Sequence, residues 1–148
     1  MTKDNWISLA GIIIQLIIAI GSYLINKNQL SKNNKKLKLD NLISKLDNLR
    51  EKSCEYWGKQ SMTPEYQGML ELEIKSSFED IKFILKGLYE SFKSIRSDIH
   101  KIQTNEYVDL NKLITGGAFE TMMRSCDKNK CDEIIKNIAS IKEKIGNL

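Results

Sequence analysis

Residues 6–25 read WISLAGIIIQLIIAIGSYLI, and this stretch decides how the protein is organised. The sequence carries no charged residue between Asp4 and Lys27. A helix rises about 1.5 Å per residue, so these 20 residues match the length that crosses a hydrocarbon core about 30 Å thick. Trp6 and Tyr23 lie near the two ends, where aromatic rings favour the headgroup region. The stretch therefore predicts one transmembrane helix.

A cleavable signal peptide is the main alternative for this stretch. Ala19 and Gly21 are small residues with the spacing of a cleavage site. The region before the apolar stretch holds only Lys3 as a basic residue, and Asp4 offsets its charge. The stretch is also longer than the usual signal core of about 7–15 residues. An uncleaved membrane anchor fits the sequence better.

The lysines beside the span predict its orientation. One lysine precedes the span, whereas five follow it before the next acidic residue: Lys27, Lys32, Lys35, Lys36 and Lys38. Positive residues accumulate on the cytoplasmic side of membranes, so we expect the N-terminus outside and the rest of the chain in the cytoplasm. The high content of Asn, Lys and Ile favours an AT-rich bacterial or phage genome, so the expected location is a bacterial inner membrane.

The same five lysines have a second possible role at the membrane surface. Each can attract anionic lipid headgroups by about 1 kcal/mol, although setting the topology is the simpler role. The net charge of +4 comes from this region, since residues 61–148 carry 13 basic and 14 acidic groups. The basic pI therefore does not indicate nucleic-acid binding.

Small and polar residues within the span share one helical face, because they recur at steps of three and four: Ser8, Gly11, Gln15, Ala19 and Ser22. Gln15 falls near the middle of the bilayer, where a partner helix can satisfy its amide. The alternative is a monomer in which Gln15 bonds to its own helix or to water. We expect this face to mediate self-association into a homo-oligomer.

Residues 39–148 predict an all-α domain without strands. Its first helix is expected to end near Gly58 and carries a seam of leucines at helical spacing: Leu39, Leu42, Leu46 and Leu49. We expect this seam to pair with a second copy, coupled to association of the span; the alternative is that it packs solely against residues 85–102 of the same chain. Thr63, Pro64 and Glu65 are typical of a helix start, and apolar residues then recur by threes and fours to Ile102. One helix is therefore predicted over residues 64–103, with Phe78, Leu85, Leu88 and Phe92 in the core.

The remaining residues predict shorter helices. A turn is expected over residues 104–109, a short helix broken at Gly116 and Gly117, a helical stretch over 118–126 and a last helix from Cys131. The expected fold class is all-α, with a single transmembrane helix followed by a cytoplasmic antiparallel bundle with coiled-coil-like patterning. Its parts are a short extracytoplasmic N-terminus (1–5), the transmembrane helix (6–25), a basic juxtamembrane linker (26–38) and the bundle (39–148).

The sequence offers little material for catalysis. It holds one histidine, His100, and three cysteines: Cys54, Cys126 and Cys131. A zinc site with three Cys and one His is possible by stoichiometry, but reduced thiols that pack as small apolar groups are the simpler interpretation. We therefore expect no catalytic residue, no cofactor and no bound metal.

These features favour a non-enzymatic, membrane-anchored helical interaction module. Its expected partners are the lipid bilayer, further copies of itself and an unidentified protein, but no nucleic acid. A scaffold, a signalling component or a membrane-acting effector of bacterial stress or phage defence would fit this description. One alternative is an envelope structural protein, similar to a phage spanin, with extracytoplasmic helices, which the lysine bias opposes. The other is a thiol- or zinc-dependent enzyme.

Overall fold

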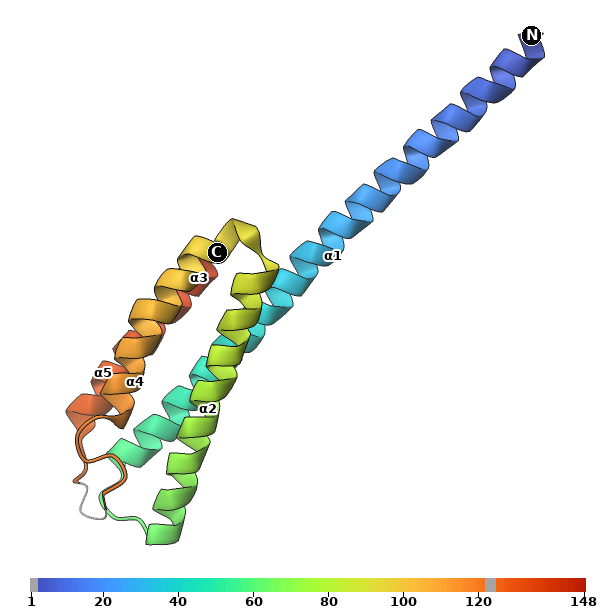
Figure 1. Cartoon of the computed structure of the whole chain (residues 1–148). Coiled ribbons are helices and arrows are strands. Elements are labelled where there is room, and N and C mark those ends of the chain that lie inside the picture. The colour runs from blue at the N-terminus through green and yellow to red at the C-terminus, as the bar shows by residue number, and fades with distance from the viewer. Residues whose placement is uncertain (1–2, 122–124) are drawn as a thin grey trace. The chain divides into compact units, whose positions relative to one another are not determined.

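The computed structural model describes residues 3–121 and 125–148, and over these residues the chain is helical and contains no strand (Figure 1). The elements in chain order are α1 (Lys3–Gly58), α2 (Pro64–Ser91), the 3-10 turn η1 (Lys93–Ile95), α3 (Arg96–Lys101), the π-helical turn η2 (Ile102–Glu106), α4 (Tyr107–Thr115) and α5 (Lys128–Gly146). The chain divides into two compact units, Met1–Leu37 and Lys38–Leu148. We call them the N-terminal unit and the helical domain.

The N-terminal unit consists of the first part of α1. Its large apolar side chains from Ile12 to Ile25 are each half or more exposed to solvent. α1 meets the length and hydropathy expected of a membrane-spanning helix, and it is the one such helix among the described residues. The helix also continues without a break through residues 26–38, so the basic segment is helical. The side chains of Trp6 and Ser8 lie outside the described residues.

The helical domain buries one apolar core to which every α-helix within it contributes. The seam leucines Leu42, Leu46 and Leu49 join Tyr56 and Trp57 from the end of α1. The other helices add residues at spacings of three and four: Ile74, Phe78, Ile81, Leu85 and Leu88 from α2, Ile99 from α3, Leu110 and Ile114 from α4, and Ile134, Ile138, Ile141 and Ile145 from α5. Burying each such side chain contributes roughly 1.5–3 kcal/mol, so these stripes hold the domain together.

Two helix ends form where the sequence predicts them. Thr63 caps α2 by accepting a hydrogen bond from the Tyr66 N–H through Oγ1 at 3.3 Å, and Pro64 occupies the first turn. α4 ends at Gly116, whose N–H donates to the Lys112 carbonyl. A Cβ at Gly116 would lie 2.5 Å from that carbonyl oxygen, so the close approach requires glycine.

The prediction of one helix over residues 64–103 is wrong. α2 ends at Ser91, and Phe92 adopts an extended conformation (φ −125°, ψ 91°) before η1 and α3. The chain turns here, in yellow in Figure 1, and α3 runs back beside α2. Arg96 Nε donates to the Tyr89 carbonyl at 3.0 Å, which satisfies one acceptor left free by the helix end. The apolar repeat stays in phase across the turn, so it identifies the buried residues but not the break.

Individual side chains on α2 also differ from the prediction. Phe78, Leu85 and Leu88 are buried as expected, whereas Phe92 is only partly buried at the edge of the core. Phe83, an apolar residue on another face of α2, is 78% exposed. One helix face is sufficient to fill the core, so an apolar residue on another face stays in solvent.

Two predictions about the second half of the chain are also wrong. Residues 104–109 are helical rather than a turn, because η2 joins α3 to α4 and Thr104 Oγ1 bonds back to the His100 carbonyl. The helix expected over 118–126 is absent from the described residues there, since Gly117 and Glu120 have positive φ angles of 72° and 63°. Met122 and Met123, which belonged to that prediction, lie outside the described residues. α5 begins at Lys128, three residues before the predicted Cys131.

Candidate functional site

The predicted association face of the span lies on an uncovered part of α1. Gly11, Gln15, Ala19 and Ser22 are all exposed within the N-terminal unit. A Cβ added at Gly11 would meet no atom within 4 Å. Steps of three and four on a continuous helix keep these residues on one face. The face is therefore open to a partner helix or to lipid, while the Ser8 side chain lies outside the described residues.

The five predicted membrane-surface lysines divide into two groups. Four belong to the N-terminal unit: Lys27, Lys32, Lys35 and Lys36. The fifth, Lys38, belongs to the helical domain, where its Nζ donates to the Gly87 carbonyl at 3.4 Å and to Ser91 Oγ at 3.1 Å. It also lies 5.5 Å from the centre of the Phe92 ring. A cation near the end of α2 complements the helix dipole, so Lys38 has a structural role in the domain.

The leucine seam is part of the core of its own chain. Leu42, Leu46 and Leu49 are at most 1% exposed, and Leu39 is partly buried against the same cluster. The seam therefore packs within the chain, as the alternative interpretation had it, and not as the expected pairing with a second copy. In this conformation it is closed to a second copy, so the structure opposes its use as an intermolecular coiled-coil surface.

A zinc site with three Cys and one His is not formed. His100 lies on α3, where its ring centre is 6.1 Å from that of Tyr89. Cys54, Cys126 and Cys131 gather elsewhere, where the end of α1 meets the start of α5. Among the described residues, no group of three His, Cys, Asp or Glu side chains is placed to hold a metal ion.

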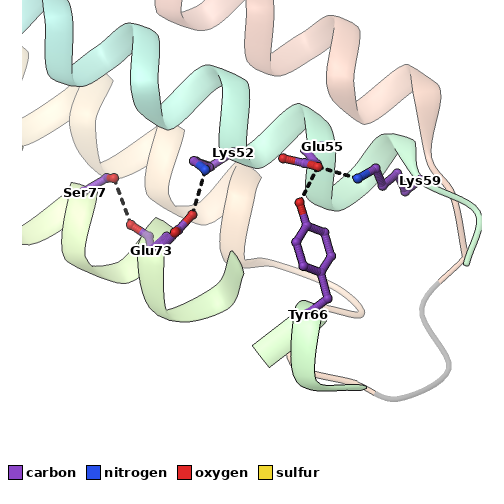
Figure 2. A network of polar contacts seen from close by, with 6 residues as sticks. All are labelled: Lys52, Glu55, Lys59, Tyr66, Glu73 and Ser77. Carbon is purple, nitrogen blue, oxygen red and sulfur yellow. Dashed lines mark hydrogen bonds and ion pairs between the residues drawn. The ribbon is translucent and has the colours of Figure 1, made fainter. Parts of the chain in front are cut away.

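A polar network between α1 and α2 was not predicted from the sequence (Figure 2). Tyr66 Oη donates to Glu55 Oε1 at 2.6 Å, and Lys59 binds the same carboxylate. One turn away, Lys52 Nζ lies 3.0 Å from Glu73 Oε2. Lys59 and then Tyr66 lower the pKa of Glu55, since both stabilise its charged form. These groups are near solvent, so the network orients the helix ends and adds little to stability.

The buried end of α1 organises the surrounding loops. Tyr56 Oη donates to Glu71 Oε1 at 2.8 Å and accepts the Glu120 N–H at 3.1 Å. The Tyr56 ring lies 5.1 Å, between centres, from the rings of Trp57 and Phe119. Burial of a tyrosine requires partners for its hydroxyl, and this pair of contacts meets that need. The contacts also hold Glu120 in its positive-φ conformation.

Trp57 is the second anchor at the end of α1. Its Nε1 donates to the Ile114 carbonyl at 3.0 Å, and its own carbonyl accepts the Asp127 N–H at 2.8 Å. Lys130 Nζ lies 3.5 Å from the centre of the Trp57 ring and donates to the Gly116 carbonyl at 2.7 Å. Tyr56 and Trp57 thus tie α4, α5 and the intervening loop to α1. The polar groups of this region form hydrogen bonds with one another, which is typical of a structural network.

A surface depression with a volume of about 370 Å³ lies between η2 and the C-terminal end of the chain. Its lining includes Asp98, Lys101, Glu106 and Lys144. Lys144 forms an ion pair with Glu106, so opposite charges already meet there. Burial is the largest single influence and raises the pKa of Glu106, but the Lys144 hydrogen bond, a backbone hydrogen bond and the Lys144 charge together outweigh it, so the pKa is lowered. The depression therefore presents a neutralised pair rather than a charged ligand site.

No known protein-family model, curated protein or solved structure matches this chain. Its function is therefore inferred from the residues and contacts of the chain itself. Two features are available for that inference: the exposed apolar part of α1 and the self-contained core of the helical domain.

Proposed function

We propose that this protein is a non-enzymatic helical interaction module anchored in a membrane by α1. One observation carries the proposal. The large apolar side chains of residues 12–25 are half or more exposed, whereas the apolar stripes of α2 and α5 are buried in the core of their own domain. An exposed apolar surface of this length is rare in a soluble monomer, and a lipid bilayer would cover it.

The helical domain is proposed to be an antiparallel bundle on the cytoplasmic side of a bacterial inner membrane. The packing of α1, α2, α4 and α5 residues into one cluster supports a bundle. The excess of lysine after the apolar segment supports the cytoplasmic side. On the outer side of α2, Leu72 is 68% and Phe83 78% exposed, which supplies apolar contacts for a protein partner. A scaffold or signalling role would use such a domain as its binding element.

A reporter fused after Leu148 is expected to show the activity of its cytoplasmic form. The lysines that follow the span hold that side of the membrane protein in the cytoplasm. The measurement uses paired reporters, one active only in the cytoplasm and one only outside it. A matched variant replaces Lys27, Lys32, Lys35 and Lys36 by glutamine and should raise the fraction with inverted topology. A wild-type fusion active only outside the cytoplasm would overturn the orientation and favour the envelope alternative.

Self-association is proposed to occur through the span rather than through the leucine seam. Gln15 lies on the exposed face that also carries Gly11, Ala19 and Ser22. An amide in the middle of a bilayer gains a hydrogen-bond partner when two such faces meet. The leucine seam is already buried within its own chain, whereas this face of the span is exposed. The span is therefore the surface that can bind a second copy.

Replacing Gln15 by leucine is therefore expected to lower the association constant of the dimer in membranes about threefold, and the crosslinked fraction with it. A polar contact of this type is worth roughly 0.6 kcal/mol on average, which corresponds to about that change in the association constant. Crosslinking at native abundance gives the measurement. Ile13→Leu is the matched control, because it places the same side chain on the opposite helix face. Equal dimer fractions in the wild type and both variants would remove this face from the mechanism.

A further inference from the structure

Three thiols converge where α1 ends and α5 begins. The Cys54 thiol lies 3.9 Å from the Cys131 carbonyl oxygen, and the Cys131 thiol lies 3.6 Å from the Cys54 carbonyl oxygen. Each of these two cysteines therefore faces the other, although 77 residues separate them in the sequence.

The third cysteine has a different partner. The Cys126 thiol donates to the Gly58 carbonyl at 3.1 Å, one turn beyond Cys54 on α1. It is near Cys131 in sequence but is engaged with the backbone at the helix end. The folded chain thus pairs Cys131 with Cys54, whereas sequence proximity alone would pair it with Cys126.

We propose that Cys54 and Cys131 form an oxidisable pair, a modification site at which a small-molecule disulfide converts the two thiols to an intramolecular disulfide. Both side chains are partly exposed, so a reagent can reach them. The reciprocal thiol–carbonyl contacts hold the two side chains together, and an S–S bond of about 2.05 Å forms when the sulfurs turn from the carbonyls toward each other. The site is independent of the membrane proposal, because it lies wholly within the helical domain.

The exchange balances with glutathione disulfide as the oxidant. The thiolate of one cysteine attacks a glutathione sulfur, forms a mixed disulfide and releases one glutathione thiolate. The other cysteine then attacks the protein sulfur of the mixed disulfide and releases the second glutathione. Two protein thiols are oxidised, one glutathione disulfide is reduced, and the two thiol protons end on the released glutathione molecules.

Partial burial keeps both cysteines protonated, so they react only when the oxidant is present for a long time. Desolvation raises the pKa of Cys54, and it raises that of Cys131 to about 11. Because the thiolate is the reactive form, exchange is slow at neutral pH. Once formed, the bond closes a loop that contains all of α2, α3 and α4, and a long closed loop restricts the unfolded chain. Oxidation therefore links α1 to α5 by a stable disulfide.

The test uses the full chain in mild detergent, incubated with glutathione disulfide and then alkylated. Trypsin cleavage after lysine and arginine places Cys54 in peptide 53–59, Cys126 in peptide 125–128 and Cys131 in peptide 131–136. Non-reducing mass spectrometry is expected to find peptide 53–59 joined to peptide 131–136 as the main product. The melting temperature of the linked protein should rise by about 5 °C or more and return after reduction.

Two controls separate the folded pair from chance oxidation. Cys126→Ser should leave the Cys54–Cys131 link intact, and Cys131→Ser should abolish it. In strong denaturant the short loop between Cys126 and Cys131 closes more readily, so that link should replace the native one. A Cys126–Cys131 link in the native protein, or mixed glutathione disulfides alone, would overturn the proposal. A link that lowers the melting temperature would also do so, because it would form only by distorting the fold.

Discussion

Replacing Leu46 by lysine is expected to unfold the helical domain. Leu46 is 1% exposed and lies in the cluster that joins α1 to the other helices. An unpaired ammonium group in an apolar core costs several kcal/mol, which is comparable to the whole stability of a small domain. The measurement is urea unfolding of the full chain in mild detergent, followed by Trp57 fluorescence in a Trp6→Phe background. The substitution should remove the unfolding transition, since Trp57 is buried only in the folded domain.

Leu72→Lys is the matched control for this substitution. It makes the same chemical change on α2, but Leu72 is 68% exposed, so the unfolding midpoint should stay close to that of the wild type. The pair of variants also tests the role of the seam. If Leu46→Lys gave a folded domain with less crosslinked dimer, the seam would be an intermolecular surface and the core described above would be wrong.

Leu88→Ala is expected to destabilise the helical domain by about 2–5 kcal/mol. Leu88 has no exposed surface and lies near the end of α2, where that helix packs on the shared core. Truncation loses the free energy gained by burying the side chain. It also leaves a cavity that the surrounding side chains fill only in part. The same urea titration gives the change in free energy of unfolding.

The control for Leu88→Ala is Leu72→Ala on the same helix. Alanine favours helix formation, and Leu72 buries little surface, so a change within about 0.5 kcal/mol is expected. Equal midpoints for the two variants would mean that the Leu88 face of α2 is not part of the core.

Periodicity in the sequence identified the core well but located the turns poorly. Ile74, Phe78, Ile81, Leu85 and Leu88 repeat by threes and fours, and all are buried. The same repeat runs past Ser91, where the helix ends without a glycine or proline to mark the end. An apolar repeat shows which side chains face the core. Two successive helices can continue the same repeat across a turn, so the repeat does not mark the turn. Boundaries that depend on tertiary contacts therefore escaped prediction.

The candidate sites divide in the same way. The apolar segment of α1 and the glycine break after α4 were predictable, because each depends on local composition. The pairing of Cys54 with Cys131 was not, and neither was the support that Tyr56 gives to Glu120 from 64 residues away. No local pattern encodes such contacts, because they exist only after the helices have packed.

The sequence by itself determined that the chain is helical, that one segment has the length and hydropathy to cross a membrane, and which faces are apolar. These properties follow from residue spacing and from transfer free energies, which act locally. Only the tertiary structure decided that the seam from Leu39 to Leu49 is closed within the chain and that Lys38 belongs to the domain. An apolar stripe must be buried, but whether its own chain or another molecule covers it depends on where distant helices return. That return is set by the combined packing of the whole core.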